Sequence, residues 1–154
     1  MKSKYLFFLI FIVTLTGCGF KLSNLENNYK IVQINTLGDK QINFKLKNKL
    51  LINSKNNSEN LIEMDLKTTV DKTIKEKNIS NQINKYEISI IVFVKYNSLN
   101  NKIYKSFSIS KSGDFNVSSK YSETLSREKQ LINSLINDIS DEIAENLALN
   151  LNDL

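Results

Sequence analysis

The stretch Leu61–Ile74, LIEMDLKTTVDKTI, alternates between two kinds of side chain along most of its length. One set is mainly apolar and comprises Ile62, Met64, Leu66, Thr68 and Val70. The other set is polar or charged and comprises Glu63, Asp65, Lys67, Thr69 and Asp71. Because successive side chains of a β-strand point to opposite faces of its sheet, this pattern predicts a strand with one buried face and one polar face.

Two later segments have the same period. Tyr86–Tyr96 alternates in the same way, although Ile91 and Phe93 make its second face partly apolar as well. Ile103–Phe115 resumes the alternation after the pair Asn100–Asn101, which is a suitable hairpin tip because Asn tolerates positive φ. The three segments together predict an antiparallel meander.

Two other segments have the spacing of amphipathic helices. The first is Lys40–Asn53, with Asp39 as its N-cap. Its apolar positions are Ile42, Leu46 and Leu50, with Phe44 and Leu51 near the same spacing. The second is Ser122–Leu149, with Ser122 as its expected N-cap. Its apolar positions are Leu125, Ile132, Leu135, Ile136, Ile139, Ile143 and Leu147.

A short apolar stretch, Tyr29–Leu37, predicts one more strand, ended by the turn at Gly38–Asp39. The expected order is therefore β-α-β-β-β-α. A helical crossover places the first two strands in one sheet by a right-handed connection. We expect an α+β fold in which two helices pack on one face of a four-stranded mixed sheet. The other face must then meet water or a partner.

Composition limits the chemistry that this chain can perform. Its 154 residues carry a formal net charge of +5, no His and one Cys. Without His, the commonest proton shuttle and metal ligand is missing, and one Cys can form neither an internal disulfide nor a thiolate cluster. The many Asn, Ile and Lys residues suggest an A+T-rich coding sequence, so the basic charge does not predict a nucleic-acid partner. We expect no enzymatic activity and no cofactor.

The amino terminus has the layout of a bacterial lipoprotein leader. Lys2 and Lys4 precede the apolar run Tyr5–Leu15, which would span only about 16 Å as a helix, too short for a bilayer core of about 30 Å. Leu15-Thr16-Gly17-Cys18 then matches the lipobox, whose Cys thiolate accepts a diacylglycerol group. We expect residues 1–17 to be removed, 18–28 to form a lipidated linker, and 29–154 to form a single domain.

The segment from Leu15 to Leu22, LTGCGFKL, resembles the start of the LptE family of lipopolysaccharide-assembly lipoproteins, whose mature ends commonly read Cys-Gly-Phe-x-Leu. The order of elements and an early Glu in the last helix, Glu128, agree with that family. Only Cys18–Leu22 is similar at the level of a motif.

The resemblance implies a non-catalytic role at the periplasmic face of the outer membrane. Members of the family sit inside the large LptD β-barrel, assist its assembly and help to deliver lipopolysaccharide to the outer leaflet. Anchoring would then be through acylated Cys18. Some members bind lipopolysaccharide through basic side chains near strand ends, since phosphates and carboxylates attract Lys and Arg. The candidates in this chain are Lys95, Lys105, Lys111, Lys120 and Arg127.

Each candidate can also be an ordinary surface residue that binds no ligand. The lysines can be solvated surface residues, and Arg127 can occupy an exposed helix position or pair with Glu123 one turn earlier. Another function also stays open, that of an auxiliary lipoprotein of a lipid-transport ABC system or another periplasmic assembly factor. Gly19 after the Cys permits sorting to the outer membrane but does not require it.

Overall fold

A computed structural model describes residues 28–100 and 102–152. The elements are β1 (Lys30–Gly38), α2 (Lys40–Asn53), β2 (Leu61–Lys77), β3 (Ile83–Ser98), β4 (Ile103–Asn116) and α3 (Tyr121–Asn152). The predicted order β-α-β-β-β-α is confirmed. The leader, the lipobox and the linker up to residue 27 lie outside the described residues.

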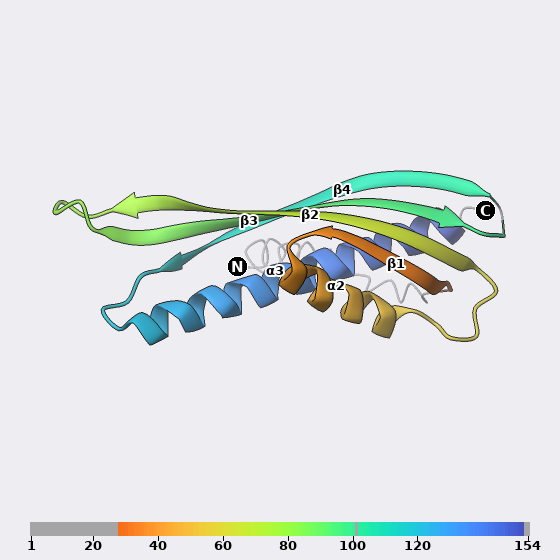
Figure 1. The fold of residues 1–154 in the computed structure, drawn as a ribbon, viewed down its shortest axis with the longest axis horizontal. Helices are drawn as coiled ribbons and strands as arrows, with labels where there is room; N and C mark the ends of the chain where they lie inside the picture. Colours follow the sequence, from red (N-terminus) through yellow and green to blue (C-terminus); the bar gives the residue numbers. More distant parts are fainter. Residues whose placement is uncertain (1–27, 101, 153–154) are drawn as a thin grey trace, which may run out of the picture.

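The four strands form one sheet in the order β1-β2-β3-β4. β1 pairs with β2 in parallel, as the crossover through α2 predicts, whereas β2, β3 and β4 form the expected antiparallel meander. Figure 1 shows the sheet as one layer and both helices as a second layer on one side of it. The molecule is therefore a two-layer structure with one sheet face covered.

The core lies between the sheet and the helices, as the alternation predicts. The apolar set of β2 faces inward, so that Ile62, Met64 and Leu66 are at most 2% exposed. β3 contributes its own inward set, and α3 packs against them with four large apolar side chains that are at most 1% exposed. These four are Ile136, Ile139, Ile143 and Leu147.

The turn between β1 and α2 is defined by two residues. Gly38 has a φ of +106°, a conformation that L side chains rarely adopt, and a Cβ built on it would collide with the carbonyl oxygen of Thr68 on β2. Asp39 then caps α2, because its carboxylate accepts a hydrogen bond of 2.9 Å from the backbone N–H of Ile42. Gly38 therefore lets β1 stay close to β2 and still turn into the helix.

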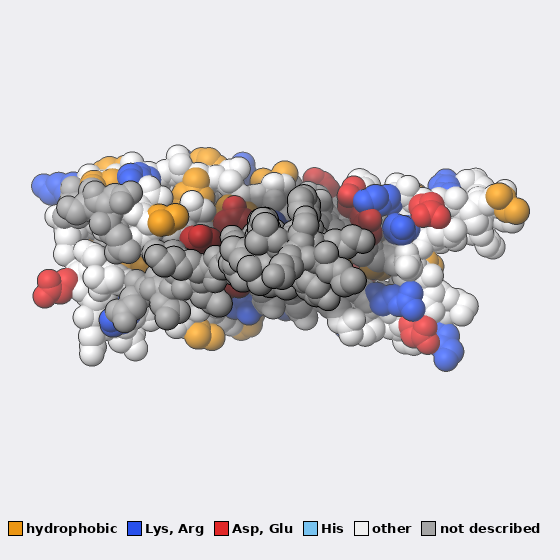
Figure 2. Space-filling view, turned by 180° about the vertical axis from the view of Figure 1, so that it is seen from behind, with side chains coloured by type: hydrophobic (Ala, Val, Ile, Leu, Met, Phe, Trp, Pro, Cys, Tyr) orange, Lys and Arg blue, Asp and Glu red, His pale blue; other side chains and the backbone are white. Residues whose placement is uncertain are grey.

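The strands of the meander are longer than the alternation predicts. β2 continues past Ile74 to Lys77, and β3 begins at Ile83, so the two form a hairpin that extends beyond the end of β1. Asn81 has a φ of 61° in its turn, and the Asn78 side chain accepts backbone N–H groups there. Seen from behind, this hairpin is an arm with a hydrophobic side chain at its tip (Figure 2). No apolar alternation marks the added residues, so the pattern underestimated the length.

Two expectations about the helices are wrong. Ser122 is not the N-cap of α3, because the helix begins at Tyr121 and its first carbonyl acceptor is that of Lys120, which receives the N–H of Thr124. Phe44 and Leu51 do not face the core, since they are 67% and 40% exposed. Both lie on the side of α2 opposite to its buried residues, where the 100° step of a helix places them.

Tyr29 joins the start of the described chain to the core. Its carbonyl accepts a 2.9 Å hydrogen bond from the N–H of Lys55, its side chain is completely buried, and its hydroxyl has no hydrogen-bond partner in the described part of the chain. Burial disfavours the charged phenolate and raises the pKa of Tyr29 to about 12. None of the described helices is long and apolar enough to cross a bilayer.

Gly38→Ala should lower the free energy of unfolding by about 3 kcal/mol, because the variant strains the backbone and forces Thr68 away. Gly113→Ala is the control, since its added Cβ would meet only the flexible Leu131 side chain, at 2.6 Å from Cδ1. Urea unfolding of both variants measures the difference. Equal stability of the two variants would contradict the account of this turn.

Tyr29 should also make stability depend on pH. The unfolded side chain loses its proton near pH 10 and the folded one near pH 12, so the unfolded state binds fewer protons in between and stability falls as pH rises. The expected loss between these two pH values is about 2–3 kcal/mol. Urea unfolding of Tyr29→Phe should show a smaller loss than the parent chain, whereas Tyr104→Phe, at a 78% exposed position, should behave like the parent. If the parent chain and both variants lost the same stability over this pH range, Tyr29 would not be the source of the pH dependence.

Candidate functional site: the uncovered face of the sheet

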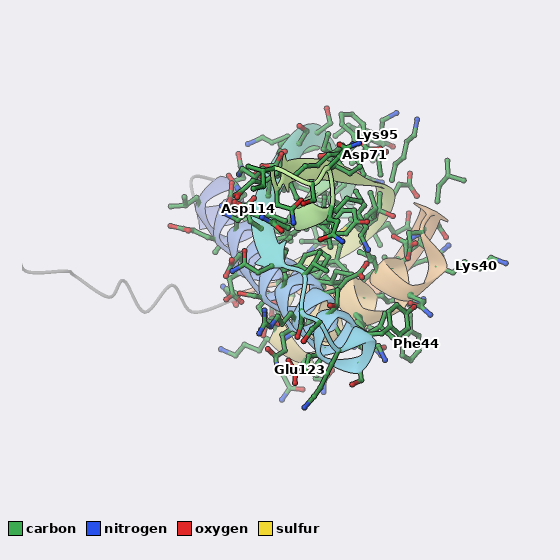
Figure 3. The ribbon with its side chains drawn as sticks, turned by 90° about the vertical axis from the view of Figure 1, so that its left-hand side faces the viewer. Lys40, Phe44, Asp71, Lys95, Asp114 and Glu123 are labelled. Carbon is green, nitrogen blue, oxygen red and sulfur yellow. The ribbon has the colours of Figure 1, made fainter. Side chains whose placement is uncertain are left out.

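One face of the sheet has no helix over it in the part of the chain that the structure describes, and we call it the uncovered face. Register places on it every second residue of each strand, beginning with Gln33, Asn35 and Leu37 of β1. β2 contributes Glu63, Asp65, Lys67, Thr69, Asp71 and Thr73. β3 contributes Glu87, Ser89, Ile91, Phe93, Lys95 and Asn97. β4 contributes Tyr104, Ser106, Ser108, Ser110, Ser112 and Asp114. In Figure 3 this face is on top, with Asp71 and Lys95 pointing away from the helices.

The middle of the uncovered face is apolar. Ile91 and Phe93 are 41% and 38% exposed, and Leu37 is 65% exposed where β1 ends. These three side chains, with Lys67 and Lys95 at the rim, line a shallow depression of about 640 Å³. The second apolar face predicted for Tyr86–Tyr96 is thus real, and in the described structure it is left open to solvent.

Lys95 lies between two hollows of this face. Its Nζ is 5.7 Å from the centroid of the Phe93 ring, close enough for a cation–π contact. Lys95 also lines an adjoining hollow of about 530 Å³, together with Asn35 and Asp65, whose side chains share a hydrogen bond of 2.8 Å. Lys95 is therefore the one sequence-predicted candidate on the uncovered face.

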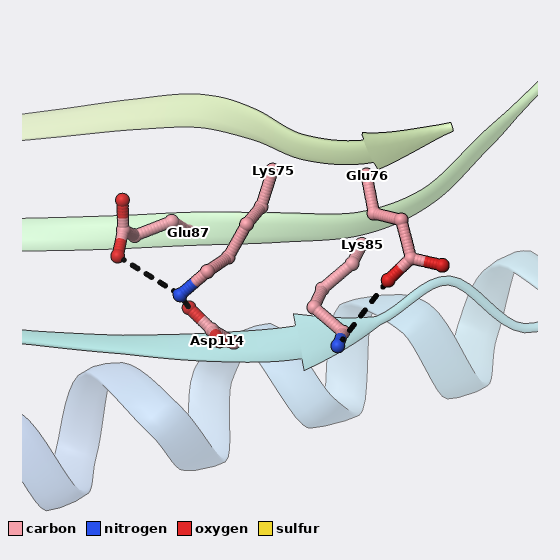
Figure 4. A network of polar contacts seen from close by, with 5 residues as sticks. All are labelled: Lys75, Glu76, Lys85, Glu87 and Asp114. Atoms are coloured by element: carbon pink, nitrogen blue, oxygen red, sulfur yellow. Dashed lines mark hydrogen bonds and ion pairs between the residues drawn. The ribbon is translucent and has the colours of Figure 1, made fainter.

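A network of ion pairs holds the far end of the face (Figure 4). Lys75 Nζ lies 2.7 Å from Asp114 and 3.3 Å from Glu87, so one lysine joins β2 to β3 and β4. Lys85 pairs with Glu76 nearby at 3.4 Å. Hydrogen bonds, first to Asp114 and then to Glu87, raise the pKa of Lys75 above its usual value.

The structure places Lys105 and Lys111 on the opposite, helix-covered face. Lys105 Nζ donates a 2.8 Å hydrogen bond to Asn150, and Lys111 forms an ion pair with Glu142, both on α3. A hydrogen bond to Glu142 raises the pKa of Lys111. These two lysines therefore help to attach α3 to β4. Lys105 also lines the hollow of about 530 Å³ beside Lys95, but its ammonium group bonds to α3 on the other side of the sheet.

The last two candidates lie at the start of α3. Lys120 is exposed and approaches Glu123 to 3.5 Å, and Glu123 also accepts a hydrogen bond from Ser118. Arg127 is exposed on the helix and donates to the backbone carbonyl of Asn116 at 3.3 Å. In the described structure Arg127 has this backbone partner, whereas the Glu123 carboxylate is engaged by Lys120 and Ser118.

The predicted position of the hairpin turn was enough to place Lys95 and Lys105 on different faces of the sheet. With the turn centred on Asn100–Asn101, Lys95 pairs with Ser106 and Lys105 pairs with Tyr96. Neighbouring register positions point to opposite faces. Counting back from the predicted tip would therefore have assigned the two lysines to different faces.

The uncovered face carries charges of both signs around an apolar centre. Besides the Lys85–Glu76 pair it carries three lysines and five acidic side chains, so it is not a cationic surface. Among residues 28–100 and 102–152 no three His, Cys, Asp or Glu side chains are placed to hold a metal ion. What the face offers is an apolar centre, a row of Ser side chains on the edge strand β4, and fixed ion pairs. This composition is typical of a protein–protein contact with a small apolar core and a polar rim.

Comparison with solved structures identifies the architecture. A provisionally assigned lipoprotein of Caulobacter crescentus CB15 matches with a TM-score of 0.55 and 12% identity over 82% of this chain and 92% of the other. A minor lipoprotein from Acinetobacter baumannii gives 0.53 and 12% over 79% and 92%, and lipoprotein B from Nitrosomonas europaea gives 0.52 and 16% over 82% and 88%. No protein-family model and no curated protein matches the chain. The chain therefore has a fold that is found among bacterial lipoproteins.

Proposed function

We propose that the protein is a lipid-anchored, non-catalytic subunit of an outer-membrane lipopolysaccharide translocon. In this role it occupies the lumen of an LptD-type β-barrel, assists its assembly and helps to deliver lipopolysaccharide to the outer leaflet. The observation that carries the proposal is the uncovered face, an entire side of a fold shared with lipoprotein structures that no element of the described chain covers.

The polarity of that face suits the proposed environment. The lumen of a large barrel is polar and filled with water, so a plug needs a hydrophilic exterior over its own core. Serines 106, 108, 110 and 112 and the Lys75 network supply such an exterior, and they carry hydrogen-bonding groups that a barrel wall can meet. The apolar depression around Phe93 would give the contact its specific centre.

The anchor in this proposal is Cys18. A lipoprotein Cys normally carries at least two acyl chains on its thioether, and two chains suffice for stable membrane attachment. The family resemblance is also the basis on which we propose that the protein lies at the periplasmic face of the outer membrane.

Lipopolysaccharide contact in this proposal is through Lys95. In the described part of the chain it is paired with no carboxylate, and it borders an apolar depression. A lysine beside an apolar surface can bind an anionic group while the hydrocarbon part of the ligand covers the apolar side chains. Lys120 and Arg127 remain secondary candidates at the other end of the molecule.

Affinity purification of the tagged protein from its own membranes tests the proposal. A large β-barrel of the translocon type should be recovered in equal amount, and Cys18→Ser should abolish lipid labelling. Recovery of the protein alone, or with an inner-membrane ATPase complex, would instead support an auxiliary subunit of a lipid-transport system.

Lys95→Glu should weaken binding of purified lipopolysaccharide about fivefold at low ionic strength, because it reverses one exposed charge. The loss should shrink as salt is added. Lys105→Glu is the matched control, one register position away on the opposite face, and it should change binding less than twofold. Equal effects of both variants would mean that Lys95 is an ordinary solvated lysine and does not bind lipopolysaccharide.

A further inference from the structure

The outer side of α2 has an apolar surface that the fold does not use. Phe44, Leu51 and Ile52 are 67%, 40% and 81% exposed. Their spacings of seven and eight residues place them on one side of the helix. Figure 3 shows Phe44 and Lys40 pointing outward from α2, away from the sheet and from α3. We call these three side chains the α2 outer surface.

The segment around this surface carries only positive charge. Lysines 40, 45, 47, 49 and 55 lie between Asp39 and Glu59, with no acidic residue among them. Lys45 donates to the side-chain oxygen of Asn133 and Lys47 to the carbonyl of Ile34, and neither forms an ion pair with an acidic side chain among the described residues. On a 100° helical step, Lys40 and Lys47 flank the α2 outer surface on one side, and Lys45 and Lys49 flank it on the other. Apolar residues between lysines are typical of a helix that lies on an anionic membrane.

The C-terminal end of α2 also lies where the chain enters the fold. The N–H of Lys55 donates to the carbonyl of Tyr29, and the Ser54 hydroxyl accepts from the N–H of Ile31 at 2.8 Å. The eleven residues from Cys18 to Asn28 precede this point, and fully extended they reach at most about 40 Å. An acyl group on Cys18 would therefore keep Tyr29, which lies beside the C-terminal end of α2, within about that distance of the membrane.

We propose that the α2 outer surface rests on the anionic lipid bilayer that anchors the protein, before a barrel takes the protein up. The inference rests on the proposed function only in requiring acylated Cys18. The acyl chains hold the protein near the bilayer, and the lysines and the three apolar side chains orient it. Because α2 lies on the helix side of the sheet, this orientation leaves the uncovered face accessible.

The chain offers a direct test, because acylation of its one Cys leaves no free thiol. Ile52→Cys in the acylated protein is labelled with an environment-sensitive NBD fluorophore and added to vesicles of phosphatidylethanolamine and phosphatidylglycerol. The emission should shift to shorter wavelength, and lipids that carry a spin label should quench it. Ile79→Cys, at a fully exposed Ile of the β2–β3 hairpin, is the matched control and should be quenched at least about threefold less.

A second pair of variants tests the charge. Lys40→Gln with Lys49→Gln should reduce quenching of the fluorophore at position 52 about fivefold. Added salt should have the same effect on the labelled protein that keeps both lysines. Lys77→Gln with Lys85→Gln, which removes the same charge from the β2–β3 hairpin, should leave the quenching unchanged.

The possible outcomes distinguish failure of this inference from failure of the proposed function. Vesicle-bound protein with equal quenching at positions 52 and 79 would overturn bilayer contact by α2 and leave the barrel proposal intact. A spectral shift at position 52 that needs added barrel would also overturn it and assign the surface to a protein. Failure of the protein to float with vesicles would refute lipid anchoring, and this inference with it.

Discussion

The packing of α3 along the inner face of the sheet is the interaction on which the rest of the structure depends. This helix of 32 residues follows the length of the meander, and its four most buried side chains each contribute about 1.5–3 kcal/mol by leaving water. Lys72 pairs with Glu128, and Lys111 pairs with Glu142, at the margins of the apolar contact. One face of the sheet is thereby completed, while the other receives nothing from the described chain.

Much of this arrangement could be predicted because the two periods, of two and of about 3.6 residues, are clear along the chain. The strand at Leu61, the helix at Lys40 and the mixed sheet all followed from them. The end of β2 beyond Ile74 could not be predicted, since residues 75–77 are all charged and exposed on both faces. Phe44 and Leu51 could only be placed near the spacing of Ile42, Leu46 and Leu50, because apolar character alone does not say which side of a short helix is buried.

The candidate site was predicted less well for a similar reason. Basic side chains mark positions along the sequence, but only register assigns them to a face, and a shift of one residue reverses that assignment. Lys105 and Lys111 belong to the attachment of α3, whereas Lys95 belongs to the uncovered face. The α2 outer surface emerged only once the structure had separated the exposed apolar residues from the buried ones. The proposed lipid contact of α2 and the proposed protein contact of the uncovered face would therefore involve different sides of one molecule.

The central claim is that the uncovered face meets another protein. Photo-crosslinking in living cells from Ser108, which lies on the edge strand of that face and pairs with Phe93, tests this directly, and Asp141, an exposed position on α3, provides the comparison. The account predicts one adduct of the size of a large β-barrel from Ser108 and little or none from Asp141. Crosslinks of equal yield from both positions, or no barrel adduct from Ser108, would contradict it.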